Sequence, residues 1–412
     1  MRIIAKLAKC IVKSRIVRVN APRAEAGMVD MVPFGMIPFG TMKTNPFKYG
    51  CVVGESWYCA RPFLEKELSR LVRGGQNVVI HGERRMGKTS LLHETVRGMR
   101  GWRLLYIDLL NIRSVSDFCK RVLSGVRDFH GRASLFEKAL RLLPRLRPVV
   151  NYDPITRGLG YSFDIKAASD PTAVEEIVDM LAAQARAHKV VVAFDEFQDV
   201  LNIPDCQTVL ALLRGKIQFQ PDIPYVFTGS VRNRMLELFD DPDSAFYKSA
   251  IALCVGGIER SAFAEFLVGR FAAGGRKVDT GTVEKVLDAV ADVPGDAQEL
   301  CEALWDVSAA RGKVDEADLP KAMEIVYARE GDKFDSFCAE LSPVQFKMLV
   351  ALAVRGGRNV QSAEFLSSAG ISNAASARET LNRLAELRHI YKYRGEWRFN
   401  GNFFRAWLRR FA

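Results

Sequence analysis

The sequence predicts an α/β protein with a doubly wound parallel sheet, followed by a helical segment and a C-terminal winged helix-turn-helix. A glycine-rich loop at residues 82–89 directly follows an apolar strand and opens a helix. Strand and helix patterns alternate from residue 58 to residue 230, as in a chain of βα units. Strand patterns then stop at about residue 257, so we expect the rest of the chain to be mainly helical.

The core elements follow from hydrophobic periodicity and from helix stop signals. The runs "KVVVAFDEF" and "IPYVFTGS" are continuously apolar, as expected for buried parallel strands, and they end at Asp195 and Ser230. The carboxyl ends of parallel strands share one edge of a sheet, so we expect the polar residues there to meet. In chain order we predict a helix at 61–73, strands at 78–81 and 104–108, helical periodicity over 114–146, a loop over 148–160, and helices at 172–187 and 207–219.

The C-terminal part divides into two predicted units. Residues 258–330 show amphipathic helices interrupted at "DVPGDAQEL", and residues 341–412 give three helices and a hairpin whose turn is 394–395. We therefore predict a core over 42–257, a helical lid over 258–340 and a winged-helix domain over 341–412. Residues 1–41 sustain no period, and we expect a disordered or non-native extension with Met42 as the native start.

Charge is distributed unevenly along the 412 residues, whose formal net charge is +11. Residues 341–412 carry twelve Lys/Arg against four Asp/Glu, and residues 1–41 carry seven against two, which leaves 42–340 close to neutral. A basic end on a neutral body indicates an anionic partner such as nucleic acid, although a solvated basic face is the commoner explanation.

The expected location follows from two further features of the sequence. No apolar run reaches the roughly 18 residues that span a bilayer, and bases interrupt the apolar N-terminus. The eight cysteines show neither metal-site nor disulfide spacing. We expect a cytoplasmic protein without a membrane partner.

The glycine loop matches the pattern G-x-x-x-x-G-K-[ST], known as the P-loop. Such a loop presents backbone N–H groups and a helix N-terminus to phosphates. Lys88 would reach the β- and γ-phosphates, and the Thr89 hydroxyl would bind Mg²⁺. The residues predicted to contact the nucleotide in this segment are Gly82, Glu83, Arg84, Arg85, Met86, Gly87, Lys88, Thr89 and Ser90.

Two acids follow the buried strand "VVVAF". Asp195 is placed to hold Mg²⁺ directly or through water, and Glu196 to orient or deprotonate the attacking water. The alternative is that both are exposed acids beginning a loop. On the next strand Ser230 is a candidate for contact with the γ-phosphate, Thr228 competes with it, and either could instead be a cap. Asp108 could support the site or cap its own loop.

The linked motifs of residues 45–410 resemble the archaeal-type ATPases of the AAA+/STAND P-loop group. The resemblance rests on "NPFKYGCVVGESWYCARPFLEKELSRLVRGGQNVVIHGERRMGKTSLL", "YIDLLNIRSVSDF", "VVVAFDEFQDV", "VFTGSVRNRM", "AFYKSAIAL" and "GNFFRAWLRR". It implies an AAA+-like core, a helical lid and a winged helix, which bind ATP with Mg²⁺ and hydrolyse ATP.

Residue by residue, the resemblance makes the glycine loop the Walker A motif. It places Gly82, Gly87, Lys88 and Thr89 on phosphates and Mg²⁺. Asp195 and Glu196 fall at the Walker B position and Ser230 at sensor 1. Tyr58 and Arg61 would lie near the adenine.

The sequence departs from this family pattern at two places. Lys248-Ser249 stands where many relatives have Gly-Arg, and Arg232 and Arg234 are poor substitutes for an arginine finger. Gln298 stands where many AAA+ proteins have a sensor 2 arginine. A missing arginine finger costs on the order of 10³ in rate, so we expect slow hydrolysis.

Three functions remain open at this point. ATP could drive a conformational switch coupled to the winged helix. The chain could instead be a DNA-binding regulator with a mainly structural nucleotide, or a scaffold for an unknown protein partner. Arg409 and Arg410 could simply be a solvated helix end. The basic side chains of the region 341–412 that could contact duplex DNA are Arg378, Arg383, Arg388, Lys392, Arg394 and Arg398.

Overall fold

The computed structural model describes residues 44–131, 149–153, 158–162, 170–186, 189–230, 235–308, 311–393 and 395–412. The expectations for residues 1–41 and for Met42 lie outside them. The chain divides into two compact units. One, the core unit, comprises residues 48–263 and 292–295. The other, the helical unit, contains residues 44–47, 264–291 and the described part of 296–412. The predicted division into core, lid and winged helix stays a prediction.

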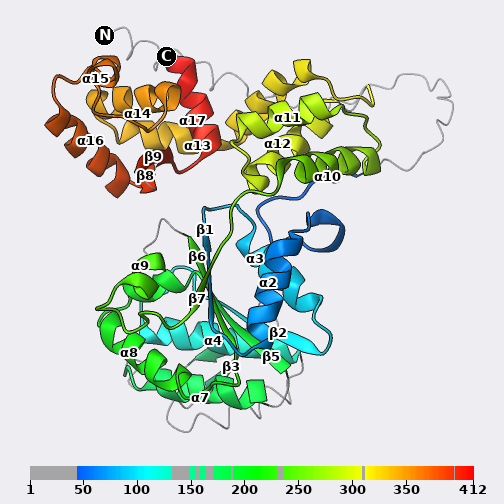
Figure 1. Ribbon diagram of the computed structural model, residues 1–412, viewed down its shortest axis with the longest axis vertical. Coiled ribbons are helices and arrows are strands. Elements are labelled where there is room, and N and C mark those ends of the chain that lie inside the picture. The colour runs from blue at the N-terminus through cyan, green and yellow to red at the C-terminus, as the bar shows by residue number, and fades with distance from the viewer. Residues whose placement is uncertain are drawn as a thin grey trace, which may run out of the picture. The chain divides into compact units, whose positions relative to one another are not determined.

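A five-stranded parallel sheet forms the centre of the core unit, with strand order β2-β5-β6-β1-β7 (Figure 1). Strands β1 and β6 are buried along their whole length, as their continuous apolar runs predict. The strands are β1 (Val78–Gly82), β2 (Trp102–Asp108), β5 (Lys189–Asp195), β6 (Tyr225–Ser230) and β7 (Ile251–Cys254).

Helices cover both faces of this sheet, which confirms the doubly wound fold. Alternate residues of β5 join different apolar clusters: Val192 and Phe194 pack with α4, α7 and α8, whereas Val191 and Ala193 pack with α2 and α3. In Figure 1, α2 and α8 lie on opposite sides of the strands. The helices of the core unit are η1 (Glu55–Trp57), α2 (Pro62–Arg73), α3 (Lys88–Arg97), α4 (Val115–His130), α7 (Ala173–Arg186), η2 (Phe197–Asn202), α8 (Cys206–Ile217) and α9 (Met235–Asp240).

Three expectations about the core elements were wrong or incomplete. Helix α4 ends at His130 because Gly131 takes a left-handed conformation (φ +62°), and the rest of the predicted helix lies outside the described residues. The segment predicted as a loop contains an antiparallel pair, β3 (Val149–Asp153) and β4 (Gly158–Ser162). Strand β7 was not predicted, because three of its four residues are exposed at the sheet edge and give no apolar run.

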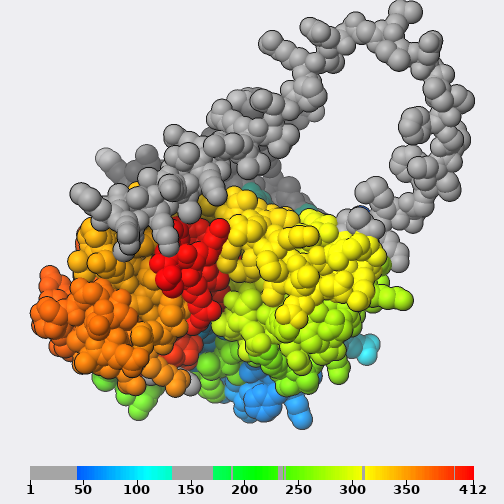
Figure 2. Space-filling model, turned by 90° about the horizontal axis from the view of Figure 1, so that it is seen from above, coloured from blue at the N-terminus to red at the C-terminus, as the bar shows by residue number. Residues whose placement is uncertain are grey.

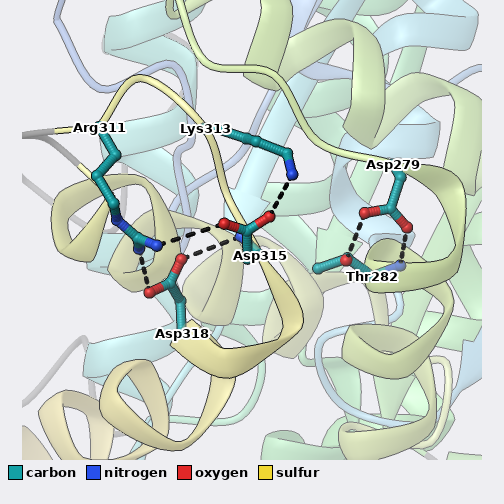
Figure 3. A network of polar contacts seen from close by, with 6 residues as sticks. All are labelled: Asp279, Thr282, Arg311, Lys313, Asp315 and Asp318. Carbon is teal, nitrogen blue, oxygen red and sulfur yellow. Dashed lines mark hydrogen bonds and ion pairs between the residues drawn. The ribbon is translucent and has the colours of Figure 1, made fainter.

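The helical unit contains the predicted amphipathic helices. Asp279 caps α11 by accepting from the backbone N–H and the hydroxyl of Thr282, both at 2.8 Å. Before α13, Asp315 and Asp318 form a capping box, and Arg311 pairs with both carboxylates (Figure 3). The helices are α10 (Arg260–Ala273), which begins in the core unit, α11 (Thr280–Ala289), α12 (Pro294–Val307), η4 (Glu316–Asp318) and α13 (Leu319–Ala339).

The segment before the core docks on these helices. Asn45 donates to the Glu302 carbonyl at 3.1 Å and to Asp306 Oδ1 at 3.0 Å. The Phe47 ring is 4.6 Å from the Phe271 ring, measured between centroids. Residues 44–47 therefore belong to the helical unit, whereas residue 48 begins the core unit.

The C-terminal elements follow the predicted order of three helices and a hairpin. Tyr393 pairs with Glu396, so the turn is 394–395 as expected, and Gly395 takes φ +83° there; Arg394 itself lies outside the described residues. A further helix, α17, follows and lies between the orange and the yellow helices in Figure 2. The elements are α14 (Pro343–Arg355), α15 (Ala363–Ala369), α16 (Ala374–Glu386), β8 (Ile390–Tyr393), β9 (Glu396–Phe399), α17 (Asn402–Leu408) and η5 (Arg409–Phe411).

Candidate functional site

The glycine loop connects the end of β1 to the start of α3, as the motif requires. At Gly82 a Cβ atom would lie 2.3 Å from the Val255 carbonyl oxygen, so the close approach of β1 to the chain after β7 requires glycine. Gly87 takes φ +82° and is the N-cap of α3, and Arg85 also has a positive φ of 63°. The loop thus ends at the positive pole of the α3 dipole.

Lys88 lies within the loop and is only 8% exposed. Its ammonium group donates to the carbonyl oxygens of Gly82 at 3.2 Å and Glu83 at 3.0 Å. Elsewhere in the motif, Arg84 and Arg85 are exposed, Met86 is buried in the core, and the Ser90 hydroxyl accepts from the Val53 N–H at 3.1 Å. The Lys88 ammonium group is therefore bound by backbone carbonyl oxygens of the glycine loop itself.

Asp195 connects the loop to the end of β5. Its Oδ2 accepts from the hydroxyls of Thr89 at 2.8 Å and Tyr106 at 2.6 Å. Its Oδ1 accepts from the Thr228 hydroxyl and from the Glu196 N–H. Asp195 is 7% exposed, so the alternative of an exposed loop acid does not hold for it. Thr89 and Asp195, both predicted as metal-side residues, are thus in direct contact.

Tyr106 was not predicted as a site residue. It lies on β2, and burial together with the Asp195 carboxylate raises the pKa of its phenol, which therefore stays a hydrogen-bond donor. Its ring packs on His93 of α3 at 5.0 Å between centroids. The available sequence signal was its position two residues before Asp108 on a strand that pairs with β5.

Glu196 begins the turn after β5 in a left-handed conformation, with φ +50°. Its Oε2 accepts from the Gln198 amide nitrogen at 2.6 Å. Burial raises the pKa of Glu196 above its ordinary value, although the Gln198 hydrogen bond opposes this. Glu196 is therefore a half-buried carboxylate held beside Asp195.

The two competing residues of β6 occupy different places. Thr228 is the one that contacts Asp195. Ser230 is buried and pairs with Gly82 in the β1–β6 register, so it lies beside the entrance to the loop. Asp108 pairs with Asp195 in the β2–β5 register and accepts from the Leu110 N–H at 2.9 Å, which makes it a cap of its own loop.

Tyr58 and Arg61 lie on the chain that leads into α2. The guanidinium of Arg61 is buried and donates to the carbonyls of Met86 at 2.5 Å and Gly256 at 2.7 Å. The Tyr58 phenol donates to Glu65 at 2.9 Å. Burial lowers the pKa of Arg61 and raises that of Tyr58. The structure thus places Arg61 against the backbone of the glycine loop.

The residues at the two departures from the family pattern take part in local structure. Lys248, three residues before the start of β7, has φ +51°, and the Ser249 hydroxyl donates to the Phe246 carbonyl at 2.7 Å. Gln298 is buried in α12. Arg232 and Arg234 lie outside the described residues.

Comparison with known proteins assigns the fold. The solved structures it resembles include a Walker-type ATPase of Pyrococcus abyssi, with a TM-score of 0.61, 18% identity, and coverage of 86% of this chain and 97% of that chain. A second is the ORC2 protein of Aeropyrum pernix, solved as ADPNP-ADP complexes. It gives a TM-score of 0.53 at 15% identity, with coverage of 89% of this chain and 96% of that chain. The fold is that of the P-loop AAA+ ATPases.

The C-terminal part is identified independently. Residues 332–410 match a family described as a probable winged helix domain. A core with this fold therefore precedes a segment that matches a winged helix, as the sequence predicted. A comparison with curated proteins finds no match. Among the described residues, no helix is both long and apolar enough to cross a membrane.

Proposed function

We propose that this protein binds ATP with Mg²⁺ at residues 82–89 and hydrolyses it slowly, as a switch coupled to its winged helix. The observation that carries the proposal is the 2.8 Å hydrogen bond between Thr89 and Asp195. It brings the hydroxyl of the glycine loop to the acid at the end of a buried strand, where a P-loop ATPase holds its metal.

The residues present fit this nucleotide and this metal. Gly87, whose φ of +82° favours glycine, lets the loop turn into the N-terminus of α3, where backbone N–H groups bind phosphates. Lys88 needs only to leave two carbonyl oxygens of its own loop to meet the β- and γ-phosphates. Thr89 and Asp195 offer the hydroxyl and carboxylate oxygens that Mg²⁺ prefers. Bound Mg²⁺ would neutralise charge on the phosphate oxygens.

Glu196 is the proposed general base. Its half-buried carboxylate has a raised pKa, which makes it a better proton acceptor than an exposed glutamate. It would take a proton from the attacking water while Lys88 stabilises the phosphate charge. Ser230, beside Gly82, would contact the γ-phosphate or the water. Without an arginine finger in the described residues around Lys248, we expect turnover to be slow.

Coupling to the helical unit is supported by the start of α12. The Gly295 N–H donates to the Arg85 carbonyl of the glycine loop at 3.0 Å. The next residue, Asp296, accepts from Asn402 of α17 at 2.8 Å, and the same amide group donates to the Val290 carbonyl at 2.8 Å. In the proposed switch, a change in the loop would pass along the chain from Gly295 to Asp296, and so from the core unit into the helical unit.

A single-turnover assay tests the ATPase proposal. We expect [γ-³²P]ATP to be hydrolysed in the presence of Mg²⁺ by excess full-length protein. Lys88→Ala should abolish binding and hydrolysis. Glu196→Gln should retain binding while the rate falls about 10²- to 10⁴-fold, because only the proton transfer is removed. Unchanged hydrolysis by Lys88→Ala would exclude this site as the source of the activity.

Duplex DNA is the second candidate partner, and the exposed arginine and lysine side chains of the winged helix favour it. Arg378 on α16, Arg388 between α16 and β8, and Lys392 on β8 are exposed. Arg383 pairs with Glu386 at 2.8 Å, and Arg398 pairs with Glu396 at 3.1 Å. Contacts between these exposed side chains and DNA phosphates would make the affinity for DNA depend on salt concentration. A protein partner in place of DNA is the alternative outcome.

A titration of labelled duplex at several salt concentrations separates the two outcomes. Arg378→Ala with Arg388→Ala should weaken binding and reduce the salt slope by about two. The control, Arg121→Ala with Arg127→Ala, removes the same charge from exposed positions of α4 in the core unit. No duplex binding by the parent protein would rule DNA out.

A further inference from the structure

We propose that Gln198 is a positioning residue for the ATPase reaction, which holds the Glu196 carboxylate in place through its amide N–H group. The proposal rests on the function proposed above, in which Glu196 is the base. It is carried by the 2.6 Å hydrogen bond from Gln198 Nε2 to Glu196 Oε2 and by the burial of Gln198, which is 3% exposed.

The orientation of the amide follows from its neighbours. Gln198 Nε2 also lies 3.3 Å from Asp199 Oδ1, so two carboxylate oxygens face the same end of the side chain. A carboxylate oxygen only accepts hydrogen bonds, and therefore the nitrogen must point to this end. The amide oxygen then points the other way, towards β6, where an added Cβ on Gly229 would lie 2.3 Å from it.

The two ends of the Gln198 amide are used unequally. Within the described part of the chain, the buried Oε1 atom has no hydrogen-bond partner. Leaving a buried acceptor unpaired is unfavourable, and a glutamine with a purely packing role would be replaced by an apolar residue at no such cost. Within the described residues, the polar contacts of the Gln198 amide therefore lie at its nitrogen end, towards Glu196 and Asp199.

Gln198 is itself held firmly. It lies in η2 between Phe197, whose ring packs on Phe194, Phe227 and Phe246, and Asp199. Asp199 accepts from the Asn111 N–H at 2.7 Å, and its own N–H donates to the Glu196 carbonyl at 2.9 Å. These contacts tie the turn after β5 to the loop after β2. A fixed amide can therefore restrict a glutamate whose backbone already has φ +50°.

This arrangement predicts a selective effect on the rate. A general base must lie within hydrogen-bonding distance of the water, and a displacement of about 1 Å can cost on the order of 10²-fold. The hydrogen bonds of Gln198 run to Glu196 and Asp199, whereas the phosphate cradle is built from β1 and α3. Loss of the amide should therefore slow hydrolysis while the affinity for MgATP stays the same.

The test compares variants of the full-length protein in single-turnover hydrolysis and in titration with a fluorescent ATP analogue. Gln198→Ala and Gln198→Glu should each lower the rate at least tenfold, with Kd changed less than twofold. Gln198→Glu keeps the shape of the side chain but offers no N–H and adds a like charge, so it separates donation from packing. Gly229→Ala, whose added Cβ would meet the Gln198 amide oxygen and also the Met235 side chain, should lower the rate at least as much.

The matched control is Gln220→Ala. Gln220 is also buried, and its amide oxygen accepts from the Tyr225 phenol at 2.5 Å. It lies near the start of β6, whereas Gln198 faces Gly229 near the end of that strand. We expect this variant to retain the parental rate. A full rate in Gln198→Glu, or a parallel loss of rate and affinity in the Gln198 variants, would overturn the proposal.

A double variant shows whether Gln198 acts through Glu196. Adding Gln198→Ala to Glu196→Gln should not lower the residual rate further, because the group that it positions is already lost. If the two effects multiply, Gln198 does not act through Glu196, although the ATPase function stands. If Glu196→Gln alone hydrolyses ATP at the parental rate, the assignment of the base fails instead, and the positioning role fails with it.

Discussion

Replacing Tyr106 with phenylalanine should destabilise the core unit by removing one hydrogen bond to Asp195. The phenol donates to Asp195 Oδ2 at 2.6 Å, from β2 across to β5. The substitution deletes the donor and keeps the ring that packs on His93. Asp195 retains the Thr89 and Thr228 hydroxyls and the Glu196 N–H, so no buried charge is left without donors.

The expected magnitude follows from the charge of the acceptor. A hydrogen bond to an ionised group contributes about 1.5–3 kcal/mol, and the remaining donors to Asp195 favour the lower end. For a unit of about 150–250 residues, 1 kcal/mol shifts the melting temperature by about 2–4 °C. We therefore expect the transition of the core unit to fall by about 3–6 °C.

Scanning calorimetry measures this shift, and the transition of the helical unit provides an internal reference. Tyr225→Phe is the matched control, because that phenol donates at 2.5 Å to Gln220, whose acceptor is a neutral amide oxygen. A neutral hydrogen bond contributes about 0.5–1.5 kcal/mol, so this variant should melt closer to the parent. A Tyr106→Phe shift below 1 °C, or one smaller than that of Tyr225→Phe, would refute the reasoning.

Two further predictions concern the helical unit. A Cβ on Gly274, the residue after α10, would lie 2.6 Å from Pro46 Cγ and from Trp305 Nε1, so Gly274→Ala should lower the free energy of unfolding by about 1–3 kcal/mol. Gly269 lies within α10 with open space around it, so Gly269→Ala should not destabilise; urea unfolding compares the two variants. Burial lowers the pKa of His389, whose ring packs on Phe337 and Phe404. The unfolded chain then binds the proton more readily, so stability should be full above a pH of about 6.5 and should fall below it. The urea midpoint should therefore change less with pH in His389→Phe than in the parent protein. An equal change with pH in both proteins would contradict this prediction.

The glycine loop and Asp195 could be predicted from the sequence because each is a local pattern with one structural solution. A strand, a glycine loop and a helix in succession define the cradle, and a fully buried strand that ends in an acid places that acid at the same sheet edge. The contact between Thr89 and Asp195 then follows from the parallel topology. The winged helix was equally predictable, since Ser342, Ser362 and Asn373 each cap a helix in the expected order.

The parts that were missed depend on neighbours distant in the sequence. Tyr106 and Gln198 are ordinary residues in their own segments, and only the pairing of β2 with β5 and the turn after β5 bring them to Asp195 and Glu196. The sequence also could not tell which of Thr228 and Ser230 lies next to Asp195, because this depends on how β6 pairs with β5 and β1. Strand β7 is paired on one edge only, so it lacks the apolar pattern of a buried strand.

The link between the glycine loop and α12 does not depend on a sensor 2 arginine. In the proposed switch the loop is tied to the start of α12 by the Arg85 carbonyl, which accepts from the Gly295 N–H, and by the Arg85 guanidinium, which donates to the Gly295 carbonyl at 3.4 Å. Gly295 cannot easily be replaced, because its Cβ would lie 2.9 Å from the Arg85 Cβ atom. A backbone contact of this kind responds to the shape of the loop rather than to the γ-phosphate itself. We therefore infer that Gln298 is compatible with a switch in which the loop conformation, not a side chain reaching the phosphate, is transmitted to α12.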